Sequence, residues 1–185
     1  MKTKLRVGID PGTFGSVVMF IENIEKPFIY VIPRLGNEIN IKKLRSILRG
    51  EDLLKNIEDY DTHIVIEDVH AVHNSSAAGT FSFGYTCGII EAIVSELDVP
   101  YSKIQPKVWQ KEMWIGIKEI RKPSKADENG KLKLGAIDTK TMSLIAAQKL
   151  FPNVKLTDPL STRAVKPHDG IVDALLIAEY AKRRF

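Results

Sequence analysis

The first apolar positions of the chain form two short runs joined by a turn. Residues 5–9 alternate between large apolar and other side chains, Pro11 and Gly12 interrupt them, and a second hydrophobic run begins at Val17. Alternation with a period of two predicts a β-strand with one buried face, and proline and glycine predict its end. The pattern therefore predicts a β-hairpin that holds Asp10 at the end of its first strand.

Further along, the apolar spacing changes between strand-like and helical. Runs of β-branched and aromatic residues predict strands over residues 27–33, 62–68 and 101–105. Apolar positions three and four residues apart predict helices over residues 39–57, 81–97, 106–114 and 138–150, and a last helix from about residue 168. Gly50 is expected to break the first of these helices. The order of strands and helices predicts a single α/β unit.

The composition limits the class of protein. The chain has 185 residues, 44% hydrophobic and 27% charged, which is typical of a soluble domain with a substantial core. It shows no apolar run near the roughly 20 residues of a membrane span and no signal peptide, so we expect no membrane and a cytoplasmic location. The one cysteine, Cys87, excludes an internal disulfide and favours a reducing compartment. The net charge of +4 and pI near 9.1 favour a polyanionic partner if the basic residues cluster.

Basic residues do cluster between about residues 117 and 136, where the sequence is polar and rich in lysine. Such a segment is typical of an insertion. Two interpretations are open, a solvated loop and a basic flap over a phosphate backbone, and the composition alone favours the loop. The basic side chains here are Lys118, Arg121, Lys122, Lys125, Lys131 and Lys133.

Two helices carry residues with more than one interpretation. Gly84 and Gly88 lie four residues apart, so they share a helix face and permit the close approach of another backbone. Core packing and a subunit interface explain this spacing equally well. Trp109 and Trp114 are expected in the core rather than as residues that stack on bases.

Four acidic side chains stand where the predicted topology can bring them together. Asp10 and Glu67 each end a strand, and Asp169 and Asp173 share a face at the start of the last helix. Each has a structural alternative, because aspartate in a turn caps its own backbone and acidic residues suit a helix N-terminus. Together the four acidic residues favour a metal-binding site, since clustered carboxylates repel one another and stay ionised only around cations. Two Mg²⁺ ions about 3.5–4 Å apart, held by shared carboxylates, are a device for phosphodiester hydrolysis.

The combination resembles the RuvC family of Holliday junction resolvases over essentially the whole chain. The segments that carry it are residues 8–12 (GIDPG), 64–67 (IVIE) and 173–178 (DALLIA), while residues 81–84 (FSFG) and 168–170 (HDG) resemble its phage-like branch. The resemblance implies an RNase H-like α/β fold, with a five-stranded mixed sheet of three antiparallel strands followed by parallel ones, flanked by helices. It also implies a homodimer that cleaves four-way DNA junctions in recombination, repair or phage DNA processing.

The resemblance further implies a metal site that binds Mg²⁺, with Mn²⁺ able to substitute. Its ligands would be Asp10, Glu67 and Asp173. Many relatives place a fourth ligand three residues before the final aspartate, where this chain has Gly170. Asp169 or His168 is therefore expected to be the fourth metal ligand.

Basic residues complete the expected site. Lys107 and Lys111 fall near DNA-contacting positions of the family, and Lys140 is similar in placement to a family lysine important for cleavage. Cellular relatives carry a phenylalanine three residues after the strand glutamate that wedges bases at the junction, whereas this chain has His70, whose ring can also stack. The residues predicted to face DNA are Lys107, Lys111, Lys118, Arg121, Lys122 and Lys140, together with His70.

Other functions fit part of the sequence. Residues 8–16 also resemble the first phosphate loop of the actin, hexokinase and chaperone ATPases, but those enzymes need two lobes and a second phosphate loop, for which 185 residues do not suffice. A nuclease for other branched DNA or RNA–DNA hybrids is a nearer alternative. A junction-binding protein without catalysis is a third, which the carboxylates disfavour.

Overall fold

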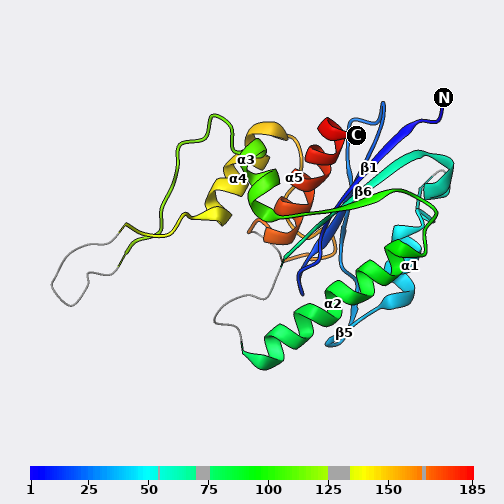
Figure 1. Cartoon of the computed structure of the whole chain (residues 1–185), viewed down its shortest axis with the longest axis horizontal. Coiled ribbons are helices and arrows are strands. Elements are labelled where there is room, and N and C mark those ends of the chain that lie inside the picture. Colours follow the sequence, from blue (N-terminus) through cyan, green and yellow to red (C-terminus); the bar gives the residue numbers. More distant parts are fainter. Residues whose placement is uncertain (54, 70–75, 125–133, 164–165) are drawn as a thin grey trace.

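A five-stranded mixed sheet forms the centre of the computed structural model, which describes residues 1–53, 55–69, 76–124, 134–163 and 166–185 (Figure 1). The strand order is β3-β2-β1-β6-β7, with β1, β2 and β3 antiparallel and with β6 and β7 parallel to β1. The strands are β1 (Lys4–Asp10), β2 (Ser16–Ile21), β3 (Phe28–Val31), β6 (Asp61–Glu67) and β7 (Tyr101–Ile104). A separate two-stranded sheet joins β4 (Arg34–Leu35) to β5 (Glu38–Ile39).

Helices cover both faces of this sheet (Figure 1). On one face lie α1 (Ile41–Leu48) and α2 (Ala77–Ser95), with the short 3₁₀ helix η1 (Ile57–Asp59). On the other face lie α3 (Pro106–Met113), α4 (Thr139–Leu150) and α5 (Asp169–Arg184). The expected α/β class with a five-stranded mixed sheet flanked by helices is therefore confirmed.

Each face of the sheet buries its own hydrophobic core, because successive strand side chains point to opposite faces. Leu5, Val7 and Ile9 of β1 pack toward α1 and α2. Val18 of β2 and Val65 of β6 pack toward α3, α4 and α5. The same alternation turns the last residues of β1 and β6 toward α5, which decides where the candidate site lies.

Strand β1 and helix α5 approach each other unusually closely at Gly8. A Cβ atom placed on Gly8 would lie 2.2 Å from the backbone nitrogen of Ala178 and 2.4 Å from the carbonyl oxygen of Ala174. Only glycine fits at this position, since no side-chain atom can occupy that space. The contact fixes the first turns of α5 against the end of β1.

The predicted elements agree with the structure apart from some of their ends. The first hairpin, the three antiparallel strands and the break at Gly50, where φ is +73°, are confirmed. The helix predicted over residues 39–57 is too long, because α1 ends at Leu48 and turns follow it. Helix α2 begins at Ala77, before the predicted residue 81, because the Ser76 side chain caps it by accepting a hydrogen bond from the Gly79 backbone, 3.1 Å long.

Helix α2 is apolar yet largely exposed. It buries Thr86, Ile90, Ile93 and Val94 against the sheet, while Gly84 and Gly88 face outward with no atom within 4 Å of a Cβ placed on them. Core packing therefore does not explain the two glycines. By length and composition this 19-residue helix could cross a membrane, the one such helix among the described residues, whereas the sequence analysis expected none. One helix of this length and composition is weak evidence for a membrane protein.

The basic segment before α4 leaves the molecule on the α3–α4 side as an extended arm (Figure 1). Its described ends pair with each other: Arg121 bridges Ile137, and the Lys122 backbone donates a 2.9 Å hydrogen bond to the Ala136 carbonyl oxygen. Part of the arm is thus a two-stranded ribbon. Lys125, Lys131 and Lys133 lie outside the described residues.

Candidate active site

Two strand ends place carboxylates side by side. Strands β1 and β6 are parallel neighbours with Ile9 opposite Ile66, so the next residues, Asp10 and Glu67, end their strands together. Both follow the alternation toward α5. Asp173 lies on that helix, one turn after its start, and the close packing of α5 on β1 brings it to the same edge of the sheet.

Asp10 sits under the turn that joins β1 to β2. Its Oδ1 accepts a 2.9 Å hydrogen bond from the Gly12 backbone. Burial raises the pKa of Asp10 above its ordinary value, and the neighbouring charge of Asp169 acts in the same direction, while the Gly12 hydrogen bond and His168 act against it. Asp10 therefore both caps its turn and takes part in a cluster of acids.

Glu67 is nearly buried, with 9% of its surface exposed. The indole N–H of Trp109, on α3, donates a 2.9 Å hydrogen bond to its Oε1. Burial raises the pKa of Glu67 to about 8, and the charges of Asp10 and Asp173 act in the same direction, while the Trp109 hydrogen bond opposes the rise. Three acidic groups are thus close enough to oppose one another's ionisation.

Asp173 has a similar environment. Burial raises its pKa to about 7, the charge of Asp10 adds to the rise, and a hydrogen bond from the Ser143 side chain on α4 opposes it. Ser143 is itself buried. Each of the three carboxylates therefore has one neighbouring donor that orients it, from the turn, from α3 or from α4.

The other expected ligands, Asp169 and His168, stand at the start of α5, near Asp10. Asp169 is exposed and forms an ion pair with Lys140, with 2.5 Å between Lys140 Nζ and Asp169 Oδ2. His168 is the N-cap of α5, and its Nδ1 accepts a 3.3 Å hydrogen bond from the Ile171 backbone. A Cβ on Gly170 would lie 2.4 Å from the Phe14 carbonyl oxygen and 3.0 Å from an Asp10 carboxylate oxygen, so no ligand side chain fits there.

The donor set fits a divalent metal ion by its chemistry. Buried carboxylates that raise one another's pKa lose that penalty when a cation lies between them, and hard oxygen ligands are those that Mg²⁺ and Mn²⁺ prefer. Among the described side chains, no three His, Cys, Asp or Glu residues already form a group that could hold a metal ion. The carboxylates would therefore have to turn toward a bound ion.

The basic residues expected to face DNA are solvent-exposed where the structure describes them. Lys107 and Lys111 lie on α3, and Lys118 and Lys122 lie at the start of the arm. Arg121 is also exposed, but its guanidinium is engaged. It bonds Glu119 (2.7 Å) and the Gly135 carbonyl oxygen (2.8 Å), so it serves the fold of the arm. His70 lies outside the described residues, and the use of these side chains in binding DNA stays a prediction.

The sequence analysis missed the two side chains that orient Glu67 and Asp173. It placed Trp109 in the core, where the structure has it fully buried, but assigned no partner to its N–H group. A buried indole usually donates a hydrogen bond, so an acceptor near Trp109 could have been expected. Ser143 carried no comparable signal.

Comparisons with known proteins agree with the resemblance at the level of the fold. No protein-family model matches the chain, and no curated protein matches its sequence. The structure is similar to that of Thermus thermophilus RuvC in complex with a Holliday junction substrate, with a TM-score of 0.50 and 14% identity over 98% of this chain and 96% of that one. A second structure of Thermus thermophilus RuvC gives a TM-score of 0.44 and 16% identity over 94% of this chain and 90% of that one. The fold is that of RuvC, which is RNase H-like.

Proposed function

We propose that this protein is a metal-dependent endonuclease that cleaves four-way DNA junctions, acting in the cytoplasm. One observation supports the proposal most: on a RuvC-like fold, Asp10, Glu67 and Asp173 come from three separate elements to one edge of the sheet and shift one another's pKa. The similar Thermus thermophilus protein binds a Holliday junction. Junctions are therefore the substrate to test first.

The proposed reaction is hydrolysis of a phosphodiester with two Mg²⁺ ions, for which Mn²⁺ can substitute. When bound, the ions would activate a water molecule and stabilise the leaving oxygen. Asp10, Glu67 and Asp173 would hold them as carboxylates, so Glu67 and Asp173 must first lose the protons that burial favours. Asp169 is the better candidate for a fourth ligand than His168, whose Nδ1 is occupied as the helix cap.

Lys140 is suited to a role beside the scissile phosphate. It is exposed, its ammonium group lies 2.5 Å from Asp169, and its charge acts on Asp173 of the carboxylate cluster. A phosphate that enters the site brings negative charge next to this ammonium, which can then pair with it. Lys140 would thereby offset repulsion between the acids and the DNA backbone.

The DNA duplexes of the junction would lie along α3 and along the basic arm of the protein. Lys107, Lys111, Lys118 and Lys122 are exposed there, and the two elements leave the same side of the sheet (Figure 1). Lysines that neutralise phosphates supply affinity without reading sequence. Arg121 is expected to shape the arm more than to bind phosphate, because its guanidinium already has two partners.

The enzyme would act as a homodimer through α2. Symmetric cutting of a four-way junction needs two sites, and a twofold dimer supplies them. Phe81 and Tyr85 stack on each other with ring centroids 6.4 Å apart, are 76% and 51% exposed, and lie beside the open Gly84 and Gly88. An exposed apolar face with two glycines lets a second copy of the helix approach closely.

A substrate panel tests the proposal. We expect the protein to cleave a synthetic four-way junction in Mg²⁺ and not in EDTA, and to leave plain duplex intact. Cleavage of flap DNA or RNA–DNA hybrids in preference to the junction would assign it to a related nuclease. If none of these substrates is cut in Mg²⁺ or Mn²⁺ although the junction is bound, the catalytic proposal is wrong.

A further inference from the structure

Trp109 directs its indole N–H at a carboxylate of the acidic cluster. Its side chain is fully buried, and its indole N–H points to the carboxylate of Glu67, with 2.9 Å between Nε1 and Oε1. The other tryptophan gives an internal comparison. The indole nitrogen of Trp114 is buried without a hydrogen-bond partner among the described residues. The Trp109 contact is therefore specific to the position next to the acidic cluster.

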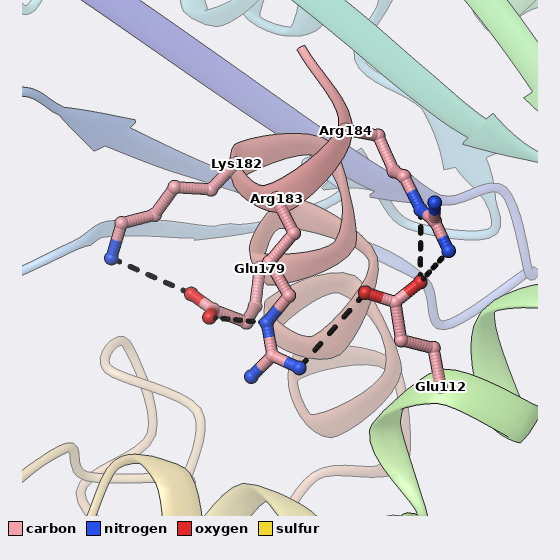
Figure 2. Close-up of polar contacts among 5 residues, drawn as sticks. All are labelled: Glu112, Glu179, Lys182, Arg183 and Arg184. Carbon is pink, nitrogen blue, oxygen red and sulfur yellow. Dashed lines mark hydrogen bonds and ion pairs between the residues drawn. The ribbon is translucent and has the colours of Figure 1, made fainter.

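Helix α3 is held against α5 near this tryptophan. Glu112, three residues after Trp109, pairs with Arg184 across 2.6 Å and with Arg183 across 4.0 Å, while Arg183 also bonds Glu179 across 2.8 Å (Figure 2). The Glu112 side chain is 17% exposed, so solvent only partly competes for it. These ion pairs tie the end of the eight-residue helix α3 to the last turn of α5, whereas the Trp109 indole makes its own contact with Glu67.

We propose that Trp109 is a positioning residue of the metal site. By donating to Oε1, the indole holds the Glu67 carboxylate in one orientation and leaves Oε2 to bind a divalent ion. Hydrogen bonds that orient metal ligands in this way commonly change metal affinity about ten- to a hundredfold when they are removed. The inference rests on the proposed function, because it takes Glu67 as a ligand.

The substitution Trp109→Phe removes the N–H donor and keeps an aromatic ring in the core. We expect it to weaken Mn²⁺ binding about tenfold, measured by calorimetry on the whole protein without DNA. Glu112→Gln is the matched control on the same helix. It loosens the ion pairs but leaves the indole donor in place, and its Mn²⁺ affinity should stay within about twofold of wild type. A folded Trp109→Phe variant with wild-type Mn²⁺ affinity would overturn the inference.

A measurement on the unmodified protein decides the question if Trp109→Phe fails to fold. The chain has two tryptophans, so a ¹⁵N–¹H NMR spectrum contains one indole N–H resonance from Trp109 and one from Trp114. On titration with Mg²⁺, the Trp109 resonance should shift and that of Trp114 should not, and Glu67→Gln should abolish the shift. A Trp109 resonance that stays unmoved while Mg²⁺ binds would exclude the positioning role.

The two proposals fail in different ways. If wild type binds Mn²⁺, Glu67→Gln loses that binding and Trp109→Phe keeps it, then the metal site stands and the positioning role of Trp109 is wrong. If wild type binds no Mn²⁺ at all, then the metal-dependent nuclease itself is wrong, and the inference drawn from it is wrong as well.

Discussion

The substitution Gly8→Ala tests how β1 and α5 hold the candidate site together. The added methyl group would lie 2.2 Å from the Ala178 nitrogen and 2.4 Å from the Ala174 carbonyl oxygen. Both are backbone atoms of a helix, which cannot rotate aside as the end of a side chain can, so α5 itself has to move. Asp173 immediately precedes Ala174 and would move with it, away from Asp10.

The expected cost follows from this geometry. Ordinary contacts of a Cβ begin at 3.4 Å, so the helix must retreat by about 1 Å. A gap of about 0.5–1 Å removes roughly a quarter to a half of the dispersion energy of the contacts it opens. Overpacking typically costs about 1–3 kcal/mol, and the rigid neighbours place Gly8 at the upper end, about 3 kcal/mol or more. That is a large part of the roughly 5–15 kcal/mol that stabilises most domains.

Urea unfolding followed by circular dichroism measures this change in stability. Gly36→Ala is the matched control, because Gly36 has a φ of +58° but no atom within 4 Å of an added Cβ. It should cost only the strain of a left-handed backbone, about 1 kcal/mol. If Gly8→Ala lowers the free energy of unfolding by no more than Gly36→Ala does, the close packing of β1 on α5 is not what fixes the site.

Three further predictions concern assembly, charge and pH. Phe81→Arg should convert a dimer into a monomer in sedimentation at micromolar protein, whereas a persisting dimer would place the interface elsewhere. Changing Lys118 and Lys122 to glutamine should make junction binding less sensitive to salt. The slope of log K against log salt should become less negative by about 0.9 for each phosphate that the protein no longer neutralises. An unchanged slope would show that neither lysine contacts the DNA. Without metal, the protein should lose stability as pH rises from about 4 to 8. Folding raises the pKa of Asp173 to about 7 and that of Glu67 to about 8. In this pH range the two groups therefore bind more protons in the folded state than in the unfolded state. Unfolding curves at several pH values check this, and stability that rises with pH would contradict it.

Local pattern was sufficient to predict much of the fold. The alternation of residues 5–9 and the apolar centre of residues 64–66 predicted central strands, and Gly50 predicted a helix end. The sequence pattern did not predict the β4–β5 ribbon, because strands of two residues show no hydrophobic periodicity. The start of α2 was not predicted because residues 77–80 (AAGT) carry no large apolar side chain, and the cap at Ser76 is a local hydrogen bond without a hydrophobic signal.

The candidate site was predictable only as far as its acids stand at the ends of elements. Asp10 and Glu67 could be picked out as strand ends, and the structure brings them together with Asp173. Their orienting partners could not be found in this way. Trp109 and Ser143 reach the carboxylates from α3 and α4, so their roles depend on how those helices pack on the sheet.

Single-turnover cleavage of an immobile four-way junction by Glu67→Gln tests the central claim most directly. The substitution keeps the size of the side chain and its acceptor for the Trp109 indole but removes one negative charge from the carboxylate cluster. We expect cleavage in saturating Mg²⁺ to be lost while junction binding is kept or slightly tightened, since less negative charge then faces the DNA. A Glu67→Gln variant that cuts the junction at a rate close to wild type would contradict the assignment of this cluster as the metal-binding active site.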